Sequence, residues 1–169
     1  MSTHFAAGPV PSAPAVNRPA TLLAALVAAA VGALATIGNA IVMRTGGDDL
    51  AVEVLASALG RPPELISTMA PSSVIADVSD TLSTRGTMAL LAGVGLVVFA
   101  LLMRKAATWS RVLVTIFAVL TGLIAGRVAT DDGSTIMIVL GILGVLGAVA
   151  AIVLTWLPAN GRYAKALKN

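Results

Sequence analysis

The hydrophobic positions of this chain gather into four long runs, which are separated by shorter polar segments. The runs cover residues 20–43, 87–103, 109–126 and 134–157. Each run is long enough to cross the hydrocarbon core of a membrane, about 30 Å thick, as an α-helix. Helices are expected because a membrane span must satisfy its backbone polar groups internally. The pattern therefore predicts an all-α, polytopic membrane protein with four transmembrane helices.

The polar segments between the runs predict the remaining organisation of the chain. Residues 1–19 are rich in Pro, Ala and Ser and are expected to form a flexible tail. Residues 44–86 are the longest connection and are predicted to form a helical loop. The connections 104–108 and 127–133 are short, so the second, third and fourth helices should pack as antiparallel neighbours. The first helix should be freer to stand apart, and residues 158–169 form a basic tail.

The charges alternate between these segments and predict an orientation. All eight acidic residues lie in 44–86 and 127–133. Six of the eleven basic residues lie in the other polar segments, and a seventh, Arg111, lies at the start of the third run, next to one of them. Lys and Arg concentrate in cytoplasmic loops of membrane proteins. Both chain ends are therefore expected in the cytoplasm (N-in/C-in), with the acidic segments outside the inner (plasma) membrane. The net charge of +3 arises from basic residues next to the hydrophobic runs, so it indicates membrane topology and not a nucleic-acid-binding surface. We therefore predict contact with the lipid bilayer and no nucleic-acid partner.

One alternative concerns the first run, which could belong to a cleaved signal peptide. Gly38, Asn39 and Ala40 form a small-x-small triplet of the kind found at cleavage sites. The run is, however, longer than the usual apolar region of a signal peptide, about 7–15 residues, and only one basic residue precedes it. A retained first helix is the preferred interpretation.

The ionisable residues predict no catalytic residue, no cofactor and no metal. When Arg111 is counted with the connection before the third helix, no span contains Asp, Glu, Lys, Arg or His. Such residues mark ion paths, proton relays and substrate sites inside membranes. Cys is absent, and the only histidine, His4, lies in the first tail. We predict that the protein is not an enzyme; Asp131 and Asp132 beside Arg127 are the sole candidates for chemistry on lipids.

Small residues recur in the predicted spans at a spacing that lets helix backbones approach closely. Association between membrane helices depends on such contacts, because the hydrophobic drive between them is small. The residues would serve packing within the bundle or, on the first helix, docking of a partner helix or a second copy as a homo-oligomer. These candidates are Ala24, Ala28, Gly32, Thr36 and Ala40 in the first helix, Gly122 and Gly126 in the third, and Gly141, Gly144 and Gly147 in the fourth.

The segment 44–86 is predicted to contain three short helices. Acidic residues at a helix start favour a first helix that ends at Gly60. A second begins near Pro63, and a third runs from Ser72 or Ser73 through Leu82. The first helix has an apolar face that would lie on the membrane or dock an extracytoplasmic partner. The predicted docking face consists of Leu50, Leu55 and Leu59.

Two motifs flank the last two spans: Arg104-Lys105 before Trp109-Ser110-Arg111, and Trp156-Leu157-Pro158-Ala159-Asn160 before Arg162-Tyr163. From Arg104 onward the chain resembles small, mostly uncharacterised actinobacterial integral membrane proteins with four helices. In those proteins the Asn, Arg and Tyr of the second motif are often contiguous, whereas Gly161 interrupts them here. The resemblance implies a source and a topology, and it transfers no catalytic residues.

These features together predict an accessory or scaffolding subunit of a larger respiratory or envelope complex, with other membrane protein subunits as partners. The spans are rich in packing residues, and the long loop offers a surface outside the membrane. The alternative is a transporter or channel for small molecules, formed by self-association. Its polar path would be lined by Thr36, Asn39, Thr115 and Thr121.

Overall fold

The computed structural model describes residues 18–103, 108–131 and 133–166, and within these ranges the chain forms helices and no strand. Four of the helices, α1, α4, α5 and α6, are long and apolar enough to cross a membrane. This confirms the prediction of an all-α, polytopic membrane protein with four transmembrane helices. In chain order the helices are α1 (Ala20–Thr45), α2 (Gly47–Leu59), α3 (Pro63–Met69), α4 (Ser72–Leu102), α5 (Thr108–Thr130), α6 (Thr135–Thr155) and α7 (Pro158–Ala166).

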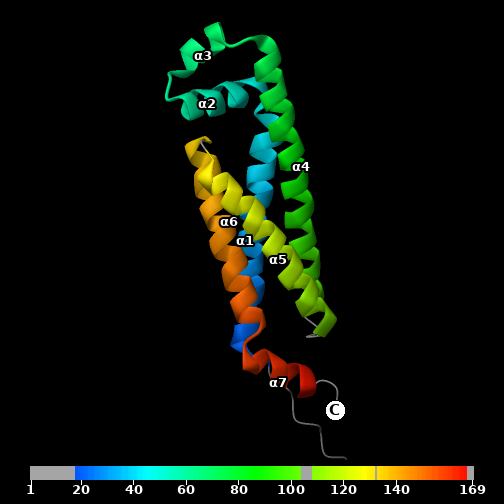
Figure 1. The fold of residues 1–169 in the computed structure, drawn as a ribbon. Coiled ribbons are helices and arrows are strands. Elements are labelled where there is room, and N and C mark those ends of the chain that lie inside the picture. Colours follow the sequence, from blue (N-terminus) through cyan, green and yellow to red (C-terminus); the bar gives the residue numbers. More distant parts are fainter. Residues whose placement is uncertain (1–17, 104–107, 132, 167–169) are drawn as a thin grey trace, which may run out of the picture.

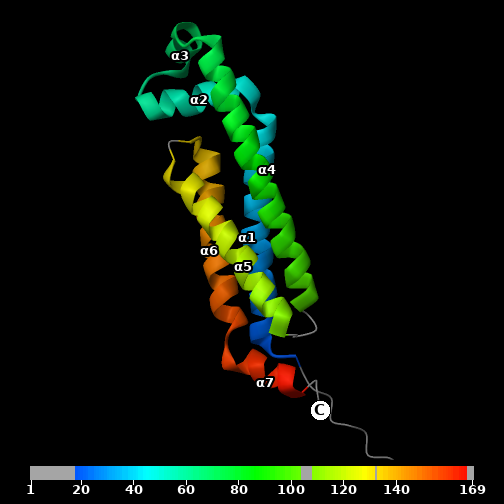
Figure 2. The same ribbon diagram turned by 45° about the vertical axis from the view of Figure 1, so that its right-hand side comes forward.

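The four long helices lie side by side and form an elongated bundle (Figure 1). Helices α2 and α3 lie across one end of the bundle, here named the cap end. Helix α7 lies across the opposite end, here named the tail end, where α1 also begins (Figures 1 and 2). An even number of crossings places the start of α1 and the end of α6 at the same end of the bundle.

Helix α4 is longer than the sequence analysis predicted. The short helix expected to stop at Leu82 is the first part of α4, which continues without a break to Leu102. The stretch contains no proline, so no residue in it removes a helical hydrogen bond. Pro71 precedes the helix in an extended conformation. The cap therefore consists of α2 and α3, and α4 rises from the bundle to meet them.

The prediction that the first helix stands apart is wrong. Helix α1 has extensive contacts with α6 on one side and with α4 on the other. Glycines permit both contacts: a Cβ on Gly147 of α6 would lie 2.4 Å from the backbone nitrogen of Gly32, and one on Gly86 of α4 would lie 2.9 Å from the carbonyl oxygen of Ala40. Such close backbone approach stabilises contacts between membrane helices, and it outweighs the freedom that the long connection 44–86 would otherwise give the first helix.

Helix α5 crosses the bundle obliquely. It begins beside the end of α4 at the tail end and finishes beside α6 at the cap end (Figures 1 and 2). Accordingly, α5 contacts α6 more extensively than it contacts α4. The α4–α5 contact is closed by Phe99 and Phe117, whose ring centroids are 4.9 Å apart. Both rings lie in the halves of α4 and α5 that are nearer the tail end, so the two helices separate toward the cap.

Candidate functional site

The small residues of α6 form a contact in this chain with both neighbouring helices. A Cβ added at Gly141 would lie 2.9 Å from the carbonyl oxygen of Ala125, so Gly141 faces α5. A Cβ added at Gly144 would lie 2.8 Å from the Cβ of Ala125 and 3.1 Å from the hydroxyl oxygen of Thr36, so Gly144 lies between α5 and α1. Gly147 faces Gly32 of α1 instead. We call the contact of Gly32 with Gly144, Gly147 and Ala148 the glycine seam. Its residues are already used for packing inside one chain.

The remaining predicted small residues range from buried to exposed. On α1, Thr36 and Ala40 are buried within the bundle, Ala28 is half-buried and Ala24 is exposed. Gly122 and Gly126 of α5 are half-buried, and a Cβ at either would make only ordinary contacts, at 3.5 and 3.7 Å. The stripe predicted on the first helix is therefore mostly enclosed by the chain itself.

The polar residues proposed for a transport path lie in helix contacts. Thr36, Asn39 and Thr121 retain at most 3% of their surface exposed. The amide nitrogen of Asn39 donates to the carbonyl of Met137 on α6 at 3.1 Å. The hydroxyl of Thr115 accepts a hydrogen bond from the indole nitrogen of Trp156, the residue that follows α6. Side chains lining a water-filled path would keep exposed surface. Within one chain, Thr36, Asn39 and Thr121 therefore lie in dry helix contacts, whereas Thr115 is half-buried.

At the tail end, Arg111 lies inside a spanning helix. From the sequence, every span is instead expected to be free of charged residues, with Arg111 in the connection before the third helix. Arg111 belongs to the first turn of α5 and is buried. Side chains of a helix point toward its N-terminus, and Arg111 reaches the tail end, where it donates to the carbonyl oxygen of Asn160. This contact provides a partner for a charge that would be costly to bury alone.

Asn160 joins three helices at the tail end. Its side-chain oxygen accepts a hydrogen bond from Thr21 of α1 at 2.8 Å, and its amide nitrogen donates to the carbonyl of Leu154 at 2.8 Å. Tyr163, one turn further along α7, is buried against the bundle core. The closing motif that carried the family resemblance thus fixes α7 across the end of the bundle.

The predicted docking face of α2 is divided between the interior and the surface. Leu50 is buried and packs with Met43, Leu82 and Val128. Leu55 is half-buried, whereas Leu59 is exposed at the far end of α2. Burial of Leu50 anchors α2 across the bundle and leaves only the distal end of the predicted face accessible. The exposed apolar surface continues onto α3 through Leu65 and Met69. These two residues line a hollow together with Leu59 and Arg61.

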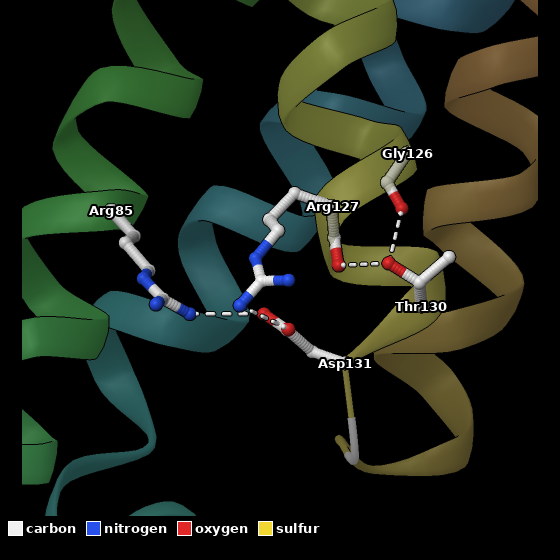
Figure 3. A network of polar contacts seen from close by, with 5 residues as sticks. All are labelled: Arg85, Gly126, Arg127, Thr130 and Asp131. Carbon is white, nitrogen blue, oxygen red and sulfur yellow. Dashed lines mark hydrogen bonds and ion pairs between the residues drawn. The ribbon is translucent and has the colours of Figure 1, made fainter.

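The charged residues at the cap end converge between α4 and α5 (Figure 3). Arg85 of α4 reaches one carboxylate oxygen of Asp131 at 3.0 Å, and Arg127 of α5 reaches the other at 3.2 Å. The backbone nitrogen of Asp131 donates to the carbonyl of Arg127, which fixes the residue at the end of α5. Asp132, the second acid of the predicted pair, lies outside the described residues. Two guanidinium groups thus share one carboxylate.

The same three charged residues border a groove of about 260 Å³ between α4 and α5. We call it the cap-end groove; its apolar lining is formed by Met88, Leu123, Ile124 and Val128. A second hollow of about 220 Å³ lies beneath α2 and shares Arg85 and Asp131 with the groove. The ion pair of Arg85 with Asp131 therefore bridges the place where α4 and α5 have separated, whereas the pair of Arg127 with Asp131 lies within the end of α5.

In the sequence, Arg85 and Arg127 lie at the edges of the second and third hydrophobic runs, and Arg127 also precedes the acidic pair; these positions alone do not predict an ion-pair cluster. A clearer signal was available: both lie on the side that the positive-inside pattern predicts to be poor in arginine. Arginines retained on that side need a local explanation. Their convergence, however, depends on the oblique course of α5, which no sequence pattern specified.

The fold defines a polytopic α-helical membrane protein with four spans and a cap of two short helices. No known protein family, curated protein or solved structure matches this chain.

Proposed function

We propose that the protein is a non-catalytic accessory or scaffolding subunit of a larger assembly in the plasma membrane, and that a partner protein contacts its cap. The observation that carries the proposal is the apolar surface of the cap. Leu59, Leu65 and Met69 are 62%, 43% and 77% exposed. They surround a hollow of about 460 Å³ at the end of α2 and along α3. Exposed apolar clusters of this kind are typical of interaction sites.

The cap is held in a fixed position, which supports its use as a binding surface. Leu50, Ala51 and Ala56 bury one side of α2, and Ile66 is the buried anchor of α3. Gly60 allows the sharp reversal between the two helices, because it adopts a left-handed conformation with φ of 59°. A preorganised surface loses less conformational entropy on binding than a disordered loop would.

The partner is expected outside the cytoplasm, because the proposed orientation places both chain ends inside. The chain contains no cysteine, so single cysteines can report this orientation. Ser57→Cys in the cap should react with a membrane-impermeant maleimide in intact cells, whereas Lys165→Cys in α7 should react only after lysis. The reverse pattern would place the cap in the cytoplasm and overturn this part of the proposal.

The partner interaction is tested by purification of the full chain through a C-terminal tag after gentle solubilisation, with quantitative mass spectrometry. We expect another membrane protein in fixed stoichiometry, and its loss from the double variant Leu59→Ser and Met69→Ser. Val74→Ser is the matched control, because Val74 is exposed at the start of α4 but does not line the hollow of the cap. Recovery of the chain alone, or unchanged recovery of the partner with the double variant, would contradict the proposal.

A further inference from the structure

We propose that the cap-end groove binds an anionic phospholipid, with the headgroup phosphate held by Arg85 and Arg127 and an acyl chain lying along Met88, Leu123 and Ile124. This inference is independent of the proposed function, because it involves the side of the bundle between α4 and α5 and requires no protein partner.

The position of the groove favours a lipid over a soluble ligand. It lies between two helices that are long and apolar enough to span the membrane, near their cap ends. Met88 and Leu123 are 59% and 67% exposed, so the groove opens sideways toward the bilayer. Van der Waals contact with a hydrocarbon chain fills such a space well, and water would find no polar partner along its apolar lining.

The charges at the rim favour an anionic headgroup. Arg85 and Arg127 carry two positive charges against the single negative charge of Asp131, so the cluster has a net charge of +1. The side chains of the arginines are 45% and 69% exposed, and neither guanidinium has another hydrogen-bond partner within the described part of the chain. Each guanidinium has five N–H donors in a planar arrangement suited to phosphate oxygens. Donors remain available to a phosphate after both arginines have bound the carboxylate.

A second groove in the molecule shows what the charged rim adds. The space of about 250 Å³ between α1 and α4 is lined only by apolar residues, among them Leu23, Val27 and Leu101. That groove can hold an acyl chain but has no group that distinguishes one headgroup from another. The cap-end groove combines a similar volume with two arginines, and selectivity for a negatively charged lipid is therefore expected only there.

The experiment counts lipids bound to the full chain by native mass spectrometry in detergent. The probes are phosphatidylglycerol and phosphatidylcholine with identical acyl chains, and soluble glycerol 3-phosphate serves as a competitor. We expect phosphatidylglycerol to bind more tightly than phosphatidylcholine. Each of the single substitutions Arg85→Gln and Arg127→Gln should weaken phosphatidylglycerol binding about fivefold. Arg61→Gln is the control, because Arg61 is exposed in the cap and lies outside the groove.

A third substitution separates lipid binding from mere support of the groove. Asp131→Asn removes the competing carboxylate, so it should strengthen phosphatidylglycerol binding by a similar factor of about five. If the arginines only held α4 and α5 together through Asp131, this variant and the arginine variants would weaken binding alike, and the proposal would be overturned. Equal binding of both lipids would also overturn it, as would displacement by glycerol 3-phosphate at the concentration at which the lipid binds.

The test does not depend on a variant that fails to fold. Thermal unfolding in the same detergent identifies misfolded variants. Arg127→Gln alone suffices if Arg85→Gln is unstable, because the Arg127 side chain is the more exposed. Unchanged phosphatidylglycerol binding by a folded Arg127→Gln variant would contradict the proposed headgroup contact.

Discussion

The glycine seam between α1 and α6 and the cap-end groove between α4 and α5 are opposite solutions to helix packing in one bundle. In the seam, the backbones of Gly32 and Gly147 approach so closely that neither position has space for a Cβ. In the groove, helices α4 and α5 have separated, and long charged side chains reach across the space. The seam excludes lipid, whereas the groove is open to it.

The difference has a physical cause in the residues available to each contact. Membrane helices gain little from the hydrophobic effect and associate through close packing and interhelical hydrogen bonds. Glycines on α1 and α6 permit close packing, and Asn39 adds a hydrogen bond. Helices α4 and α5 meet through Phe99 and Phe117 near the tail end, and toward the cap end the two helices separate (Figure 1). Four substitutions test this contrast, in order of decreasing effect on stability.

The largest loss is expected from Gly147→Ala in the seam. The added methyl group would lie 2.4 Å from the backbone nitrogen of Gly32, and overpacking a well-packed core typically costs about 1–3 kcal/mol. Because the clash is with backbone, we expect about 3 kcal/mol, the upper end of that range. Equilibrium unfolding in mixed micelles measures the loss. Gly122→Ala is the control, since its methyl group would lie 3.5 Å from the Cβ of Ala148; equal losses from both variants would refute the seam.

Phe117→Ala should be the next most destabilising substitution. A buried phenylalanine replaced by alanine loses about 3–5 kcal/mol. Phe117 is only half-buried, so a loss of about 2 kcal/mol is expected from its ring contact with Phe99 and the space left behind. Unfolding is measured in the same way. Ile116→Ala, at an exposed neighbouring position, should change stability little, and a similar loss there would show that the aromatic contact does not hold α4 and α5 together.

Asn39→Ala should weaken the contact between α1 and α6 by about 1 kcal/mol, the order of magnitude measured for hydrogen bonds between membrane helices. The variant removes the bond from the Asn39 amide to the carbonyl of Met137. The neighbouring Gly38→Ala provides a control, because its methyl group would meet only the side chain of Leu140 at 3.6 Å. If Asn39→Ala left the unfolding free energy unchanged, the hydrogen bond would contribute nothing to the contact between α1 and α6.

The smallest effect is expected from Asp131→Asn, at about 0.5 kcal/mol or less, because exposed ion pairs contribute little to stability. The two pairs of Asp131 involve arginine side chains that are 45% and 69% exposed. Unfolding should be measured at low and at high salt, and the small difference from the unchanged chain should vanish at high salt. A loss above about 2 kcal/mol would mean that the ion pairs, and not the aromatic contact, hold α4 and α5.

Much of the fold could be predicted, because each membrane span must be apolar, helical and long enough to cross the bilayer, and these requirements are visible in the sequence. The four runs and the glycine reversal at Gly60 were visible from residue types alone. The continuity of α4 was not predicted, because the second hydrophobic run begins only at Thr87. The polar residues before it, Arg85 and Gly86 among them, nevertheless continue the helix, since nothing there breaks it. The burial of Arg111 could not be predicted either, because the carbonyl that accepts its hydrogen bond belongs to Asn160, which is distant in the sequence.

The sequence by itself determined that this protein is an all-α membrane protein with four spans, because hydrophobicity and helix length are local properties. It also identified Gly32, Gly141, Gly144 and Gly147 as positions of close helix approach, but not Gly86 of α4. Only the tertiary structure decided which of them meet, that α1 lies between α4 and α6, and that Arg85, Arg127 and Asp131 converge. These outcomes arise from contacts among several helices at once, among them the oblique course of α5 that brings the charged residues together, and they leave no periodic pattern in any one helix.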